Sequence, residues 1–279
     1  MNFSKMNGLG NDFVVVAHFQ QTPGNAPEMA MQLCNRHFGV GADGLVFILP
    51  STKGDFRMRI FNADGSEAEQ CGNAIRCVAK YIYDHGMSQK DRLNIETLAG
   101  IQAITLEVDH EKVSRVTVDM GAPILKSGEI PVASEGDEII NHPIEVEGQQ
   151  FFFTGVSMGN PHGVIFVENA REFDVEKWGP LLETHPIFPR KANIEFVTVH
   201  TQDEMDMRVW ERGCGQTLAC GTGACATVVA GVLTGKTQRR GLVHLKGGDL
   251  EIEWNDQDGH VYMTGPAEEV FTGNWLKSF

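Results

Sequence analysis

The chain has 279 residues, of which 42% are hydrophobic, so it is long enough either for one large domain or for two smaller ones. Its 23 basic and 37 acidic side chains give a formal net charge of −14. Because nucleic acids and anionic membranes are bound mainly through clustered cations, this balance disfavours both as partners.

The first half of the chain predicts strands alternating with helices. Apolar runs bounded by turn residues predict, in chain order, a strand over 12–19, a helix over 26–38, and strands over 44–49 and 55–61. A second helix is expected after Cys71, where "AIRCVAKYIY" is apolar on most faces, as in a helix enclosed by a sheet. The segments 92–100, 101–109 and 112–120 alternate apolar and polar residues, which is typical of antiparallel strands with one buried face.

The second half of the chain predicts the same order of elements. They are, in chain order, a strand over 163–168, a helix over 174–185, strands over 193–199 and 204–210, a helix after Cys220, and strands over 241–247, 249–256 and 260–265. The helix "ACATVVAGVL" is again apolar on most faces. The two halves are therefore expected to share one fold.

A long internal repeat agrees with this order. A shift of 149 residues carries Asn11 onto Asn160. The same shift carries Cys71 onto Cys220 without a gap. A period this long is not that of a solenoid, and it predicts two copies of one domain facing each other. The expected domains are residues 1–120, residues 121–264, and a C-terminal strand, 265–279, that completes the first domain.

Both cysteines precede a helix and are followed by residues with small side chains. The first turn of a helix exposes unpaired N–H groups and carries partial positive charge, so Gly72-Asn73 and Gly221-Thr222 can admit a small carboxylate. The same field is expected to lower the pKa of each cysteine from its free value of about 8.5. If the two copies face each other, two sulfurs reach one carbon from opposite sides. Inversion of a stereocentre by proton transfer requires that arrangement.

The sequence shows no motif for a cofactor or a metal. The six cysteines form no C-x-x-C pair, and no two histidines stand three or four residues apart, which disfavours structural zinc. The segment "GVGADG", residues 39–44, has the glycine spacing of a nucleotide loop, but it precedes a predicted strand where such a loop would open a helix. We expect no cofactor and no bound metal.

Nothing in the sequence predicts a membrane or secreted protein. No segment approaches the roughly 20 apolar residues that span a bilayer. The first residues, "MNFSKMNGLGNDF", lack the apolar stretch and the cleavage site of a signal peptide. We expect a cytoplasmic protein that acts on a small molecule and binds neither nucleic acid nor membrane.

Five motifs, in this order, resemble those of the diaminopimelate epimerase family: "KMNGLGNDF", "GVGADG", "FNADGSEAEQCGNAIRC", "GNPHGV" and "RVWERGCGQTLACGTGACA". The resemblance implies an α+β fold of two pseudo-symmetric domains, each a mixed, mostly antiparallel sheet wrapped around a central helix, with the active site in the cleft between them. It implies an isomerase that interconverts LL- and meso-2,6-diaminopimelate without a cofactor, in the biosynthesis of lysine and peptidoglycan precursors. It also makes a homodimer reasonable.

Carried over by position, the resemblance makes Cys71 and Cys220 the acid–base pair. It assigns the reacting carboxylate to Gly72, Asn73, Gly221 and Thr222. It assigns the other substrate contacts to Asn11, Asn62, Asn160, Asn193, Glu211 and Arg212, and it places His162 and Glu211 as candidates to tune the thiols. This agrees with the side chains themselves, since the guanidinium of Arg212 can grip a distal carboxylate at two points and carboxylate or amide oxygens can accept from ammonium groups.

Some alternatives stay open at the level of sequence. Asn7, Gly44 and Gln216 stand where many members of the family carry other residues. Because a fold does not define a substrate, a racemase of another amino acid, such as histidine, on the same scaffold is the second hypothesis. A thiol redox or metal-binding protein without turnover is the third. Entry of solvent deuterium at Cα of candidate amino acids distinguishes the three.

Overall fold

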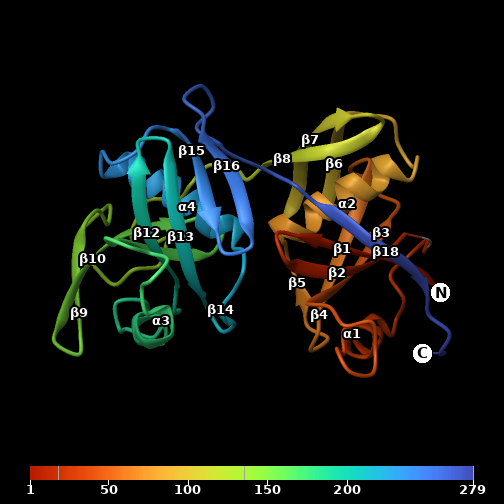
Figure 1. Cartoon of the computed structure of the whole chain (residues 1–279), viewed down its shortest axis with the longest axis horizontal. Coiled ribbons are helices and arrows are strands. Elements are labelled where there is room, and N and C mark those ends of the chain that lie inside the picture. Colours follow the sequence, from red (N-terminus) through yellow and green to blue (C-terminus); the bar gives the residue numbers. More distant parts are fainter. Residues whose placement is uncertain (18, 135, 279) are drawn as a thin grey trace. The chain divides into compact units, whose positions relative to one another are not determined.

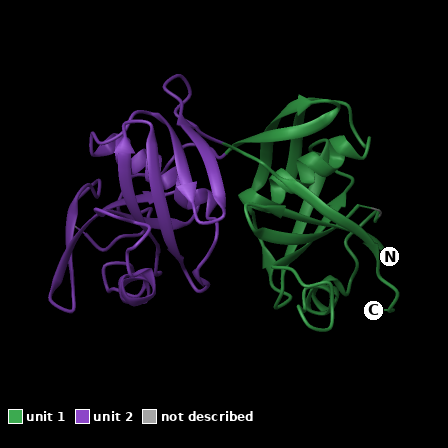
Figure 2. Cartoon of the chain, viewed as in Figure 1, with its two compact units in different colours: residues 1–119, 264–279 green, residues 120–263 purple. Residues whose placement is uncertain are grey.

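The computed structural model describes residues 1–17, 19–134 and 136–278. The chain divides into two compact units (Figure 2). Unit 1 comprises Met1–Asp119 and Thr264–Phe279, and unit 2 comprises Met120–Met263. These bounds lie one residue from the domain boundaries expected from the repeat. None of the helices in the described residues is long and apolar enough to cross a membrane.

Unit 1 is a mixed sheet around one helix (Figure 1). Its elements are β1 (Asn2–Gly8), β2 (Asn11–Val16), α1 (Ala26–Leu33), β3 (Gly44–Leu49), β4 (Phe56–Asn62), β5 (Glu67–Ala68), α2 (Gly72–Asp84), β6 (Arg92–Thr97), β7 (Gly100–Asp109), β8 (Lys112–Asp119) and β18 (Glu268–Asn274). β1 pairs antiparallel with β2 and β18, β2 pairs parallel with β3, and β3 pairs antiparallel with β4. β4 pairs parallel with β6, and β7 is antiparallel to both β6 and β8.

Unit 2 repeats this plan. Its elements are β9 (His142–Val146), β10 (Gln149–Ser157), β11 (Pro161–Phe166), α3 (Val175–Glu183), β12 (Asn193–Thr201), β13 (Glu204–Glu211), β14 (Gly215–Gln216), α4 (Gly221–Leu233), β15 (Arg240–Leu245) and β16 (Gly248–Trp254). β10 pairs antiparallel with β9 and β11, β11 pairs parallel with β12, and β12 pairs antiparallel with β13. β13 pairs parallel with β15, which pairs antiparallel with β16. A further strand, β17 (Val261–Gly265), spans the boundary of the two units.

The register of the strands repeats with the same period as the sequence. In unit 1, Phe13 of β2 lies opposite Gly44 of β3. In unit 2, His162 of β11 lies opposite Asn193 of β12, which is the same pair 149 residues later. α2 and α4 also start and end 149 residues apart. The two units are therefore two copies of one framework at the level of backbone pairing.

The central helices can be buried because most of their side chains are small or apolar. Within α4, every residue from Gly223 to Gly231 is buried, and most of them are small. Gly231 shows how closely the chain packs there, since a Cβ at that position would overlap the hydroxyl group of Thr237. α2 is enclosed by strands of unit 1 and α4 by strands of unit 2. The prediction of two buried helices, each wrapped by a mixed sheet in an α+β fold, is confirmed.

The helix predicted over 26–38 is shorter in the structure and ends at Leu33. The N–H groups of Val40 and Gly41 donate to the carbonyl oxygen of Leu33, so the chain turns back there. The side chain of Asn35 also accepts from the N–H groups of His37 and Phe38, which replaces the helical bonds. Asn and Asp side chains commonly compete with helices in this way.

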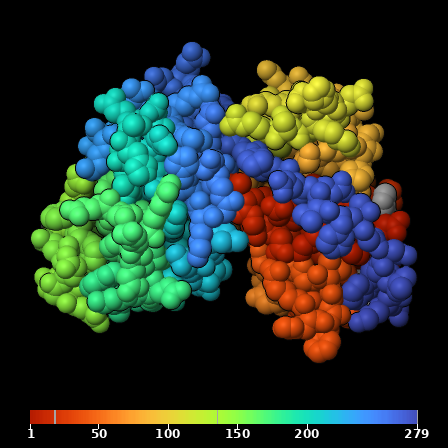
Figure 3. Space-filling view, viewed as in Figure 1, coloured from red at the N-terminus to blue at the C-terminus, as the bar shows by residue number. Residues whose placement is uncertain are grey.

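Several strand predictions also differ from the structure. The strand expected over 12–19 is β2, which ends at Val16, and His18 lies outside the described residues. β1, β9 and β10 were not predicted. The C-terminal strand expected over 265–279 is β18, and Phe279 lies outside the described residues. β18 runs over the surface of unit 1 beside β1, where Val270 and Phe271 are exposed (Figure 3).

Candidate active site

Cys71 is the N-cap residue of α2 and adopts an extended backbone conformation. Its Sγ lies 3.7 Å from Oδ1 of Asn11, at the start of β2. The same oxygen accepts a hydrogen bond from Nδ2 of Asn73 at 3.1 Å. Nδ2 of Asn11 donates to the carboxylate of Asp43 at 2.8 Å, which fixes the amide with its oxygen toward the sulfur. Unit 1 therefore brings Cys71, Asn11 and Asn73 together and presents an acceptor to the thiol.

Cys220 is the N-cap residue of α4, also extended, and it is 5% exposed. Its Sγ accepts a hydrogen bond from the N–H of Gly223 at 3.4 Å and lies 3.5 Å from the hydroxyl oxygen of Thr222. Nδ2 of Asn160 donates to that hydroxyl oxygen at 3.3 Å. Unit 2 therefore brings Cys220, Thr222 and Asn160 together and presents donors to the sulfur.

Carboxylates dominate the electrostatics around Cys220. Burial, followed by the charges of Glu211 and Glu195, raises the pKa of the Cys220 thiol well above its usual value. The expectation that the helix N-terminus lowers this pKa is therefore wrong for Cys220, because desolvation and two nearby carboxylates outweigh the hydrogen bonds from Thr222 and Gly223. Burial likewise raises the pKa of Glu211, which hydrogen-bonds Thr217 and Cys220.

His162 and Glu195 form a fully buried pair in unit 2. Both side chains are 0% exposed, and Nδ1 of His162 lies 2.7 Å from Oε1 of Glu195. Nε2 of His162 lies 3.0 Å from Oδ1 of Asn160. The sequence predicted a role near the thiol for His162 but not for Glu195. The sequence offers one weak signal, since Glu195 is an acidic residue within the otherwise apolar run "IEFV".

Two of the residues predicted to bind the substrate, Asn193 and Arg212, have different environments. Asn193 is 4% exposed, and its amide donates to the carbonyl oxygen of Pro161 and accepts from the backbone N–H of Arg212. Arg212 is exposed, and its guanidinium donates to the carbonyl oxygen of Arg190 at 3.2 Å. Asn193 thus holds the loop that carries Arg212.

Three other predicted positions have simple surroundings. Asn62 ends β4 and is exposed, and its Nδ2 donates to the hydroxyl oxygen of Ser66 at 3.0 Å. Gly72 and Gly221 are the first residues of α2 and α4. Neither glycine carries a side chain that would cover the N–H groups of its helix's first turn. These N–H groups are the donors that a carboxylate would use.

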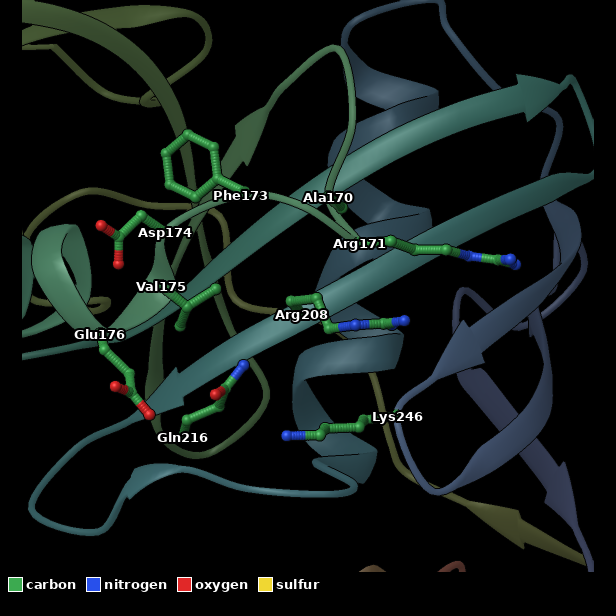
Figure 4. A pocket seen from close by; sticks show the side chains of 9 residues that line it. All are labelled: Ala170, Arg171, Phe173, Asp174, Val175, Glu176, Arg208, Gln216 and Lys246. Carbon is green, nitrogen blue, oxygen red and sulfur yellow. The ribbon is translucent and has the colours of Figure 1, made fainter.

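A polar hollow on unit 2 is lined by other residues (Figure 4). Its lining includes the basic side chains of Arg171, Arg208 and Lys246 and the acidic side chains of Asp174 and Glu176. It contains no thiol and none of the predicted site residues. Within residues 1–17, 19–134 and 136–278, no group of three or more His, Cys, Asp and Glu side chains is placed to hold a metal ion.

Comparison with known proteins decides the family. The sequence model described as diaminopimelate epimerase matches residues 3–126 and 154–270. The chain belongs to the diaminopimelate epimerase family. Among curated members of this family, it is 56% identical over 280 residues to the diaminopimelate epimerase of Desulfitobacterium hafniense, and the match covers 99% of each chain. It is 55% identical to that of Acetivibrio thermocellus, with 98% of each chain covered. The resemblance seen in the motifs is confirmed.

Solved structures of low sequence identity share the fold of this chain. A PhzF-family phenazine biosynthesis protein of Bacillus anthracis is similar with a TM-score of 0.69 at 20% identity, and the match covers 99% of each chain. A probable proline racemase of Agrobacterium radiobacter K84 is similar with a TM-score of 0.72 at 14% identity, over 99% of this chain and 93% of that one. These likenesses concern the fold alone.

Proposed function

We propose that this chain carries out the reaction of its family by two-base proton transfer, with Cys71 and Cys220 as the two bases. The reaction interconverts LL- and meso-2,6-diaminopimelate, and it serves the biosynthesis of lysine and of peptidoglycan precursors. One observation carries the assignment: a cysteine caps the buried central helix in each of two copies of one framework. The proposal requires both helix N-termini to face one substrate molecule.

The proposed reaction moves two protons and leaves no net change in charge. One sulfur, as a thiolate, takes the hydrogen from Cα, and the electron pair that remains spreads into the adjacent carboxylate. The other sulfur, as a thiol, gives its proton to the opposite face of Cα. The first sulfur thus gains a proton and the second loses one. In the reverse direction the two roles exchange.

The first turns of α2 and α4 support the developing charge. The carboxylate of the reacting centre gains negative charge as the Cα–H bond breaks, and backbone N–H groups at a helix N-terminus stabilise such charge. Gly72 and Gly221 leave these groups accessible to a small anion. Asn73, one residue further along α2, adds a side-chain donor at the same place.

The two sulfurs have different hydrogen-bond partners. The carbonyl oxygen of Asn11 faces Cys71, and an acceptor there favours the S–H form. The N–H of Gly223 and the hydroxyl of Thr222 face Cys220 and favour a thiolate, whereas burial and the charges of Glu211 and Glu195 raise its pKa and favour the S–H form. We assign the distal carboxylate of the substrate to Arg212, whose exposed guanidinium offers a two-point grip that the zwitterionic end of diaminopimelate fits.

Deuterium uptake tests this function. The enzyme is incubated with LL-diaminopimelate in deuterated water, and the meso product is isolated and analysed by mass spectrometry and NMR. Two-base transfer predicts one solvent deuterium at the inverted Cα of each product molecule formed early in the reaction. The Cys71→Ala and Cys220→Ala variants should form meso product far more slowly than the parent enzyme. Product that keeps its original hydrogen at the inverted carbon would contradict the proposal, because one base would then have carried the proton across.

A further inference from the structure

A buried ionisable pair stands in unit 2 where unit 1 has only apolar residues. The shift of 149 residues that relates the two copies carries Phe13 onto His162 and Val46 onto Glu195. Phe13 is 2% exposed and Val46 is 0% exposed. The same framework therefore forms in unit 1 with apolar residues at these positions. Since burying a charged pair carries a large desolvation penalty, the fold alone does not account for Glu195 and His162.

The pair begins a chain of contacts that ends at the sulfur of Cys220. Oε1 of Glu195 lies 2.7 Å from Nδ1 of His162, and Nε2 of His162 lies 3.0 Å from the amide oxygen, Oδ1, of Asn160. Nδ2 of Asn160 lies 3.3 Å from the hydroxyl oxygen of Thr222. That oxygen lies 3.5 Å from Sγ of Cys220. Each step is within hydrogen-bond distance, so the carboxylate is linked to the thiol through three side chains.

The equivalent sulfur in unit 1 is supported in another way. Asn11, the counterpart of Asn160, is anchored by the carboxylate of Asp43 and turns its oxygen toward Cys71. The imidazole and the carboxylate beneath Asn160 thus have no counterpart at the equivalent positions of unit 1, Phe13 and Val46. The pair therefore occurs beside Cys220 and is not a feature of the backbone framework that the two units share.

Glu195 also packs directly against the first turn of α4. A Cβ at Gly223 would lie 2.7 Å from Oε1 of Glu195 and 3.2 Å from Sγ of Cys220. Within the described residues, the second carboxylate oxygen of Glu195, Oε2, is buried and has no hydrogen-bond partner. A glutamate is thus kept beneath the thiol although one of its oxygens is desolvated without compensation, which argues for a role of the other oxygen.

We infer that Glu195 is a positioning residue for Cys220. Its carboxylate accepts a hydrogen bond from Nδ1–H of His162 and so fixes the imidazole, whose Nε2–H donates to the amide oxygen of Asn160. Asn160 then holds the hydroxyl of Thr222 against the sulfur. This inference rests on the proposed function of Cys220 as a base. The charge of Glu195 raises the pKa of Cys220, but in this inference the contacts that Glu195 orders have the larger effect on proton transfer. Loss of Glu195 should therefore impair the half of the reaction in which Cys220 removes the Cα hydrogen and spare the half that depends on Cys71.

Elimination separates the two halves. A diaminopimelate analogue with a halide on Cβ loses the Cα hydrogen to the base and the halide with its electron pair, and a double bond forms between Cα and Cβ. No second proton donor takes part. Each isomer of the analogue therefore reports on the one sulfur that faces its hydrogen. The Cys71→Ala and Cys220→Ala variants, measured first, define which isomer belongs to which sulfur.

Two variants of Glu195 test the inference. Glu195→Gln keeps the shape of the side chain but replaces the charged carboxylate by a neutral amide, which holds the imidazole through a weaker hydrogen bond. The double variant His162→Phe with Glu195→Val copies the apolar pair of unit 1, so it is expected to fold even if the single variant does not. Both should slow elimination from the isomer that Cys220 deprotonates by about tenfold or more and leave the other isomer unchanged.

Asp206→Asn is the matched control. Asp206 is another buried carboxylate of unit 2, 2% exposed, that pairs with Arg171 and His200 outside this chain of contacts. Its loss should lower the melting temperature without changing the ratio of elimination rates for the two isomers. If the Glu195 variants slow both isomers equally, or neither, the positioning role is refuted. If the two cysteine variants themselves show no opposite preference, the proposed function fails whatever Glu195 does.

Discussion

Cys71 and Cys220 occupy equivalent positions of the repeat, but their sulfurs meet different groups. Cys71 faces the carbonyl oxygen of Asn11, whereas Cys220 faces the N–H of Gly223 and the hydroxyl of Thr222. Against these donors, burial and two carboxylates raise the pKa of Cys220. A helix N-terminus is therefore not sufficient to predict the protonation of a thiol, because burial and the acids nearby have the larger effect.

Arg212 gives a test at the scale of one residue. Arg212→Lys should lower kcat/KM for diaminopimelate by about tenfold or more, since an ammonium group cannot grip a carboxylate at two points. The loss should be larger than for any amino acid substrate that lacks a second carboxylate. Arg240→Lys, at an exposed arginine paired with Glu251, is the control and should have little effect. Equal losses on both kinds of substrate would make Arg212 structural.

At the scale of the element, α2 and α4 have the same length but differ in the first turn. The shift of 149 residues carries Ala74 of α2 onto Gly223 of α4. Ala74 is fully buried, so the framework has room for a Cβ at this position in unit 1. In unit 2 that room is taken by the carboxylate of Glu195. The glycine is therefore explained by its neighbour on β12 and not by the helix.

Gly223→Ala tests this explanation. Helix propensity alone predicts that alanine stabilises the protein by about 1 kcal/mol. The contact of 2.7 Å with Oε1 of Glu195 predicts the opposite, a lower free energy of unfolding and lower activity. In the background of Glu195→Val, the same substitution should stabilise. Urea unfolding measures both effects, and a Gly223→Ala protein as stable as the parent would contradict the packing argument.

A histidine connects three strands of unit 2 and makes their stability depend on pH. His244 of β15 pairs with Asp249 of β16 at 2.7 Å and with Glu204 of β13 at 3.0 Å. The hydrogen bond to Asp249, above all, raises the pKa of His244 from 6.5. A raised pKa in the folded state means that the stabilisation is complete below pH 6.5 and is lost as the pH rises through the folded value.

His244→Gln should therefore lower the free energy of unfolding more at pH 6 than at pH 8.5. Urea unfolding at a series of pH values measures the difference. His110→Gln, at an exposed histidine of unit 1, is the control and should not change the pH dependence in this way. If the loss in His244→Gln is the same at both ends of the range, the ion pairs of His244 do not contribute to stability.

At the scale of the whole molecule, the repeat was the most informative feature of the sequence. Local patterns predicted the two buried helices and the strands beside them, because apolar runs and turn residues are local signals. The C-terminal strand that completes unit 1, β18, was also predicted, but its partner β1 at the other end of the chain was not. Pairing between distant strands leaves no local signal in a single sequence.

The candidate site, like the fold, could be predicted only in part. The cysteines and the small residues after them follow one another in sequence, so their place at the helix N-termini could be predicted. Glu195 could not be predicted by the same reasoning, because a lone acid in a strand usually faces solvent. Only the pairing of β11 with β12 shows that Glu195 meets His162 in the interior.

The central claim is that two thiols act on opposite faces of one carbon. Elimination from the two isomers of a β-halogenated diaminopimelate tests it most directly, with Cys71→Ala and Cys220→Ala measured side by side. Epimerisation should fall by more than the factor of about 10² to 10⁴ typical of one acid–base group in both variants. Each variant should nevertheless retain elimination from one isomer only, and the two should retain opposite isomers. If both variants prefer the same isomer, or neither eliminates from any, the claim is contradicted.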